Sequence, residues 1–225
     1  MEQILNPNIQ ALRAYAAIIV VLFHASILVS VNGFSYGILK SATFNIEKWG
    51  DFGVDIFFII SGYIMFMINA KRKQSPLEFI TDRIKRIVPV YWVLTILFTC
   101  LLLFVPFAFR NLNFSSEHFI TSLLFISKYF NYESPVLYVG WTLEYEMFFY
   151  LAFAIVLFLR KNSPIQQIVL LTLIFLISIA FGTFTSIIFE FLYGGIIFIF
   201  FNKYSIINKF GNKLTKITNH AKKFF

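Results

Sequence analysis

The sequence predicts an all-α fold: a polytopic transmembrane helical bundle with about six full spans and one short re-entrant or interfacial helix. Of its 225 residues, 59% are hydrophobic and only 13% are charged. The apolar residues stand in runs that approach or exceed the roughly 18 to 20 residues of a helix that crosses a bilayer. A soluble domain of this size could not bury that much apolar surface, so a lipid bilayer is the expected environment.

The expected spans follow the apolar runs in chain order. The first run is too long for the apolar core of a signal peptide and has no small-residue cleavage site, so we expect it to remain in the mature protein. The third span opens at Pro89. Between the third and fourth, the apolar segment 118–127 is too short to cross and predicts the interfacial or re-entrant helix. The six spans are expected at 11–31, 51–69, 88–108, 141–159, 165–181 and 186–202.

Basic residues follow the second, fourth and sixth expected spans. By the positive-inside rule, these loops and both termini lie in the cytoplasm, on the inner side of a bacterial-type plasma membrane. Residues 1–202 then form one membrane domain, and 203–225 form a basic cytoplasmic tail that lies near anionic lipid. This distribution accounts for the net charge of +8 without a nucleic-acid partner. The basic residues are Lys71, Arg72, Lys73, Arg83, Lys85, Arg86, Arg160, Lys161, Lys203, Lys209, Lys213, Lys216, Lys222 and Lys223.

The first span carries two ionisable residues that membrane helices rarely contain. Arg13 and His24 are eleven residues apart, and at about 100° per residue they share one face, about 16 Å apart along the axis. Ionisable groups at membrane depth usually face a protein interior or a water-filled cavity. The pair predicts a polar path along this face, although His24 alone could also be an interhelical hydrogen-bond partner.

Two acidic residues are expected near the depth of His24. Counted from the outer ends of their spans, His24 lies about 10 Å deep, Asp55 about 6 Å and Glu146 about 7 Å. Glu144 lies about 200° around the helix from Glu146, so we expect at most one of them to point inward, and we take the face of Glu146 and Tyr150 as the inner one. The alternatives are that Asp55 lies near the headgroups and that Glu146 pairs structurally with an arginine.

Two arginines precede the third span and point to an anionic ligand. Arg83 and Arg86 are three residues apart, hence on one helical face, just before Pro89. Two guanidinium groups on one face can grip a phosphate in fork geometry. Their alternative role is that of ordinary positive-inside anchors.

These features resemble the acyltransferase 3 family, integral membrane enzymes that acylate surface carbohydrates and related molecules. The resemblance covers about residues 8 to 200 and rests on segments that come in family order. Family members usually carry several further C-terminal spans. We therefore expect this chain, alone and monomeric, to be weakly active or inactive and to need a second copy or another membrane protein that closes the cavity wall. The segments are Arg13 to His24, "GVDIFFIISGY", "RIKRIVPVYW", "WTLEYEMFFY" and "FEFLYGG".

The resemblance implies a membrane O-acyltransferase. It would move an acyl group from cytoplasmic acyl-coenzyme A to a hydroxyl of a cell-surface polysaccharide or its lipid-linked precursor. The expected acyl group is acetyl. A histidine would act as general base, with an acidic neighbour that orients its ring. The roles that follow are donor binding for Arg13, Arg83 and Arg86, and catalysis for His24, Asp55 and Glu146.

Other functions fit the same buried polar groups. A membrane transporter or proton-relay protein would use them as a substrate or proton path, and a truncated, non-catalytic remnant would only bind lipid or partners. Paired discontinuous helices or an inverted repeat would favour transport, and the sequence shows neither. The single cysteine, Cys100, excludes an intramolecular disulfide and a cysteine metal cluster, and we expect neither a metal nor a permanently bound cofactor.

Overall fold

The described part of the chain is helical. The computed structural model describes residues 7–31, 50–72, 74–105, 107, 114–159 and 163–203. These ranges contain α-helices, short 3₁₀-helices and turns but no strand, which confirms the all-α prediction. Within them, five helices are long and apolar enough to cross a membrane: Pro7–Ile27, Phe52–Lys71, Pro76–Phe104, Tyr138–Phe158 and Ser186–Lys203.

Four of the predicted spans agree with helices to within a few residues. They are α1 (Pro7–Val31), α3 (Gly50–Lys71), α6 (Trp141–Phe158) and the helix Ser186–Lys203, called the 186–203 helix below.

The predicted span 165–181 also agrees with a helix to within one residue, and this helix is shorter than the other four. It is α7 (Pro164–Ala180), with 17 residues and hence a length of about 26 Å. This is the short end of the range that crosses a bilayer, about 17 to 25 residues. Of the predicted basic tail only Lys203 lies within the described residues.

The third span starts earlier than predicted. Its helix, α4 (Pro76–Phe104), begins at Pro76 rather than near residue 88, and Pro89 lies inside it. Ser75 caps the helix: its hydroxyl accepts a hydrogen bond from the Glu78 N–H at 3.2 Å, while the Glu78 carboxylate accepts one from the Ser75 N–H at 3.0 Å. This reciprocal capping box satisfies two backbone donors that a helix start leaves unpaired. The basic stretch before Pro89 is therefore helical and not a loop.

The short segment before the fourth span forms an 8-residue helix, α5 (Ser116–Leu123). At about 12 Å it cannot cross a bilayer, as predicted. Two side chains of α4 hold its carboxyl end. The Tyr91 hydroxyl donates to the Ser122 carbonyl at 3.2 Å, and the Trp92 indole N–H donates to the Leu123 carbonyl at 2.9 Å.

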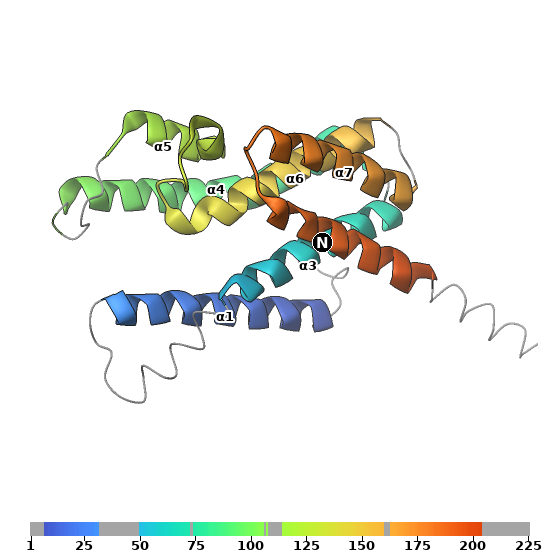
Figure 1. Ribbon diagram of the computed structural model, residues 1–225, viewed down its shortest axis with the longest axis horizontal. Coiled ribbons are helices and arrows are strands. Elements are labelled where there is room, and N and C mark those ends of the chain that lie inside the picture. The colour runs from blue at the N-terminus through green and yellow to red at the C-terminus, as the bar shows by residue number, and fades with distance from the viewer. Residues whose placement is uncertain are drawn as a thin grey trace, which may run out of the picture.

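Helix α6 lies at the centre of the packing. It contacts α3, α4 and α7, whereas α1 packs along α3 at the side of the molecule (Figure 1). The core between these helices is aromatic. Phe191 of the 186–203 helix stacks on Phe149 of α6 at 4.3 Å and on Phe58 of α3 at 4.5 Å between ring centroids. All three rings are buried, so they join α3, α6 and the 186–203 helix into one cluster.

Two glycines allow α3 and the 186–203 helix to touch backbone to backbone. A Cβ atom at Gly62 would collide with the Phe191 carbonyl, and one at Gly194 would collide with backbone atoms of Ile59 and Tyr63. Small residues at such crossings are typical of membrane helix pairs, because they let the backbones approach closely. Gly62 and Gly194 are therefore packing residues of this crossing.

We expect Gly194→Ala to lower the thermal stability of the protein. The added methyl group meets backbone atoms that cannot rotate away, and overpacking of this kind costs about 1 to 3 kcal/mol. The midpoint of thermal unfolding in detergent micelles measures the effect. Ala17→Leu adds more volume at an exposed position of α1 and should leave the midpoint nearly unchanged. An unchanged midpoint for Gly194→Ala would contradict the close approach.

Candidate active site

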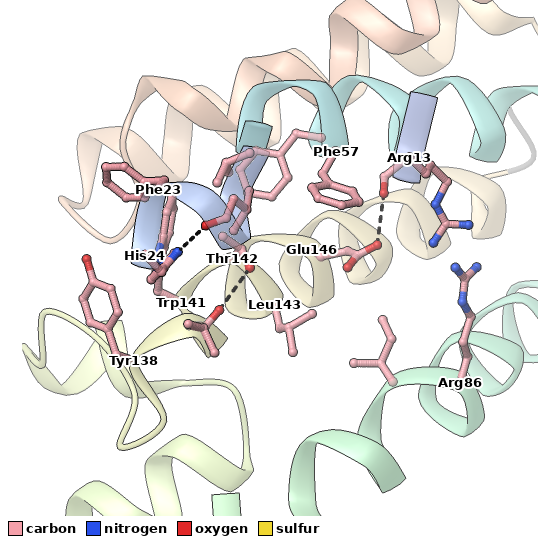
Figure 2. Close-up of a pocket in the computed structure, with 16 residues that line it drawn as sticks. Arg13, Phe23, His24, Phe57, Arg86, Tyr138, Trp141, Thr142, Leu143 and Glu146 are labelled. Atoms are coloured by element: carbon pink, nitrogen blue, oxygen red, sulfur yellow. Dashed lines mark hydrogen bonds between the residues drawn. The ribbon is translucent and has the colours of Figure 1, made fainter. Parts of the chain in front are cut away.

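A cavity of about 360 Å³ lies between α1, α3, α4 and the start of α6 (Figure 2). Pockets that bind small molecules usually measure about 300 to 1,000 Å³ and combine apolar walls with a few polar groups. This cavity has that character. Its lining residues are Arg13, Val20, Phe23, His24, Val54, Phe57, Phe58, Ser61, Arg86, Ile87, Tyr138, Val139, Trp141, Thr142, Leu143 and Glu146.

His24 stands at one end of the cavity. Its Nδ1 lies 2.8 Å from the Val20 carbonyl oxygen of the preceding turn. A carbonyl only accepts hydrogen bonds, so Nδ1 carries the proton, and in the neutral ring Nε2 is left as the basic nitrogen. The backbone of α1 thus fixes the tautomer of this imidazole. The Tyr138 ring lies 6.4 Å from it between centroids and is largely exposed.

Two arginines mark the other end. Arg13 lines the same cavity as His24, which confirms that the two share one face of α1. Figure 2 shows Arg13 of α1 and Arg86 of α4 reaching toward each other. Two guanidinium groups that converge from different helices suit an anionic ligand such as a phosphate.

The structure separates the two arginines of the predicted phosphate fork. Arg86 lines the cavity, whereas Arg83 does not. Arg83 is only 5% exposed, and its guanidinium lies over the rings of Phe79 and Tyr150, at 5.4 and 5.8 Å from their centroids. A spacing of three residues places both on one side of α4 but does not show that aromatic rings cover one of them.

Glu146 lies on the cavity wall between the two ends (Figure 2). Its Oε1 accepts hydrogen bonds from the Ser61 hydroxyl, at 3.1 Å, and from the Tyr150 hydroxyl. The face shared by Glu146 and Tyr150 is therefore an inner one, as predicted. The second oxygen, Oε2, accepts no hydrogen bond from the described residues.

Asp55 lies next to cavity-lining residues but does not itself line the cavity. It is half-buried on α3 and is not among the lining residues, although its neighbour Val54 and the following Phe57 and Phe58 are. Its expected role as the acid that orients His24 stays a prediction.

Glu144 corrects the expectation that at most one of the two α6 glutamates points inward. It is 1% exposed and accepts a hydrogen bond from the Ser127 N–H at 2.9 Å. Ser127 begins the 3₁₀-helix η3 (Ser127–Phe130), which covers the side of α6 opposite Glu146. Burial, together with this carboxylate, raises the pKa of the nearby Tyr129. Both glutamates are thus enclosed by protein, because η3 covers the side of α6 that carries Glu144.

Several lining residues have no role in the sequence prediction. Val54, Phe57, Phe58 and Ser61 stand at positions i, i+3, i+4 and i+7, which is the signature of one helix face. Ser61 contributes a hydroxyl to the cavity. The periodicity was readable, but only the structure shows which neighbour this face meets.

Comparison with known proteins finds one family and two relatives. A family model described as "Acyltransferase domain" matches residues 6–211. The exopolysaccharide production protein ExoZ of Rhizobium meliloti is 46% identical over 116 residues, which cover 50% of this chain and 36% of ExoZ. The O-acetyltransferase OatA of Staphylococcus aureus is 28% identical over 189 residues, which cover 77% of this chain and 28% of OatA. The chain therefore spans less than half the length of each of these curated relatives. No solved structure matches it.

We expect a cysteine introduced into the cavity to react with a charged, water-soluble thiol reagent. In a Cys100→Ser background, Thr142→Cys should be modified, because Thr142 lines the cavity. Thr95→Cys is the matched control and should stay unmodified, because Thr95 is 0% exposed. Mass spectrometry of the purified protein measures both. Equal reaction of the two, or of neither, would contradict an open cavity at this place.

Proposed function

The chain belongs to the acyltransferase 3 family, and from this premise we propose that it is a membrane O-acyltransferase that transfers an acyl group, acetyl in the first place, from acyl-coenzyme A. The acceptor is a hydroxyl of a cell-surface polysaccharide or of its lipid-linked precursor. Two relatives support this choice: one is named for exopolysaccharide production and the other for O-acetyl transfer.

The proposal rests on one observation, which is that polar groups of different kinds lie at the two ends of one cavity. Arg13 and Arg86 lie at one end and His24 at the other, and Arg13 and His24 are about 16 Å apart along α1. In the proposal, the arginines bind the phosphates of coenzyme A. The extended pantetheine arm is of the right order of length to bring the thioester to the imidazole. A shorter cavity would not separate a charged anchor from the reacting group in this way.

The chemistry at the histidine end follows from its tautomer. Nε2 accepts the proton of the acceptor hydroxyl as its oxygen attacks the thioester carbonyl. The new carbon–oxygen bond forms, the carbon–sulfur bond breaks, and the imidazolium returns the proton to the departing thiolate. The Glu146 carboxylate stabilises the positive charge that develops on the ring. Tyr138 and Trp141, at the same end, offer amphipathic ring faces for the acceptor.

In this proposal the donor enters from the cytoplasm. The basic residues at the start of α4 and the end of α3 then mark the cytoplasmic side, with both termini on that side of a bacterial-type plasma membrane. Binding of acetyl-coenzyme A to the purified chain would support this reading over a transporter or a non-catalytic remnant, neither of which needs a thioester.

We expect His24→Ala and His24→Gln to reduce acyl transfer by about 10² to 10⁴, the usual effect of losing a general base. Membrane insertion and acetyl-coenzyme A binding should persist. The assay follows release of free thiol from acetyl-coenzyme A in nanodiscs, with surface polysaccharide from cells that lack the protein as acceptor. His118→Gln is the matched control, since this histidine stacks on Tyr132 away from the cavity. Near-normal turnover of His24→Gln would refute the base assignment.

We expect Arg86→Gln to weaken coenzyme A binding and raise the donor KM, with Arg86→Lys restoring only part of the affinity because lysine lacks the guanidinium fork. Lys85→Gln removes the same charge from the adjacent, exposed position, which does not line the cavity. The affinity of Lys85→Gln for coenzyme A, measured by calorimetry, should be close to that of the wild type. If both variants lose affinity equally, the cavity does not hold the phosphates.

A further inference from the structure

Arg83 is a buried cation that the donor-binding site does not use. It lies in a membrane-length helix, is 5% exposed and does not line the cavity. Its Nε has no hydrogen-bond partner among the described residues. A positive charge buried in protein costs free energy unless other groups compensate for it. The contacts of Arg83 therefore indicate what it stabilises.

Those contacts lead to the cavity through one tyrosine. The Arg83 guanidinium lies over the Phe79 and Tyr150 rings, which themselves meet edge to face at 6.1 Å. Tyr150 is 2% exposed, and its hydroxyl donates to Glu146 Oε1. Arg83 makes no direct hydrogen bond to Glu146. The order of contact is thus guanidinium, phenol, carboxylate, running from α4 into α6.

This arrangement fixes the carboxylate. Two hydroxyls, of Tyr150 and Ser61, bind the same oxygen of Glu146, and none of the described residues donates to Oε2. The guanidinium holds the Tyr150 ring by a cation–π contact. It also places a positive charge behind the phenol, where the low dielectric makes its compensation of the carboxylate strong.

We propose that Arg83 is a positioning residue that acts through Tyr150 to hold the Glu146 carboxylate toward the reacting groups, and that it does not bind the acyl donor. The two arginines of α4 then have different tasks: Arg86 binds the donor and Arg83 orients the acid. This inference rests on the proposed function, because it assigns Arg83 a part in the same acyl transfer.

The two simpler roles of Arg83 do not fit its surroundings. A positive-inside anchor extends its head group into water, whereas this guanidinium lies against two buried rings. A donor ligand must reach the cavity, and among the described residues Tyr150 lies between Arg83 and the cavity-lining Glu146.

The experiment is a double-mutant cycle on the purified full chain. Arg83→Met, which keeps most of the side-chain length, Tyr150→Phe and Glu146→Gln are measured singly and in pairs. Acetyl-coenzyme A is the donor, and surface polysaccharide from cells that lack the protein is the acceptor. We expect each single variant to lower kcat by about tenfold or more and to leave the donor KM within about twofold, as when an interaction made in the transition state is lost. Arg83→Lys, which keeps the cation over the ring, should recover part of kcat.

Coupling separates a positioning role from a merely structural one. If Arg83 acts through Glu146, adding Arg83→Met to Glu146→Gln should lower kcat by less than about twofold more, because coupled residues are not additive. Arg86→Gln, the comparison, should multiply with Glu146→Gln and should raise the donor KM. Multiplying effects of Arg83→Met and Glu146→Gln would overturn the proposal, and so would a raised donor KM in Arg83→Met.

Two further measurements cover other failures. If Arg83→Met does not insert, the cycle is run with Tyr150→Phe, which removes only a hydroxyl, and additivity with Glu146→Gln would again overturn the proposal. If the wild-type chain transfers no acyl group as a monomer, as an oligomer or in the membranes of its own cells, the proposed function fails by itself. The midpoints of thermal unfolding of the same single and double variants, which need no turnover, then test the contacts between Arg83, Tyr150 and Glu146. Non-additive changes in the midpoint support these contacts, and additive changes refute them.

Discussion

The arrangement of this protein depends on the cost of leaving polar groups without partners in hydrocarbon. Each such group costs several kcal/mol in a membrane, so the helices themselves must supply the partners. They do so at short range along α1, where the Val20 carbonyl binds His24. They also do so between helices, where Ser61 of α3 and Tyr150 of α6 bind the Glu146 carboxylate. The cavity is the place where these satisfied groups meet, and its chemistry follows from how they are satisfied.

Helix α3 connects this polar site to the packing of the whole bundle. Ser61 faces the cavity, and the next residue, Gly62, lies against the backbone of the 186–203 helix. One turn of helix therefore sets both the crossing and the position of the hydroxyl that holds Glu146. A change in the angle or distance of that crossing would move the carboxylate with it. The aromatic cluster around Phe191 fixes the same crossing from the other side.

The helices and the shared face of Arg13 and His24 could be predicted because they follow from apolar run length and helical period, properties of one segment at a time. The early start of α4 was also readable: Ser75, Pro76 and Glu78 form a recognisable capping box, but the neighbouring charges suggested a loop. The burial of Arg83 could not be predicted, because it depends on where the Tyr150 ring of another helix lies.

Helix α4 has 29 residues and is about 44 Å long, some 14 Å more than the hydrocarbon core of a bilayer. A helix with this mismatch tilts or extends past the boundary. Counted about 20 residues back from Phe104 at the opposite boundary, the hydrocarbon ends close to Arg86. A nucleotide held by Arg86 would stay at the level of the headgroups, and only an uncharged thioester arm would travel deeper. The length of one helix would thus sort a ligand by polarity along the membrane normal and leave the ionic head in water throughout the reaction.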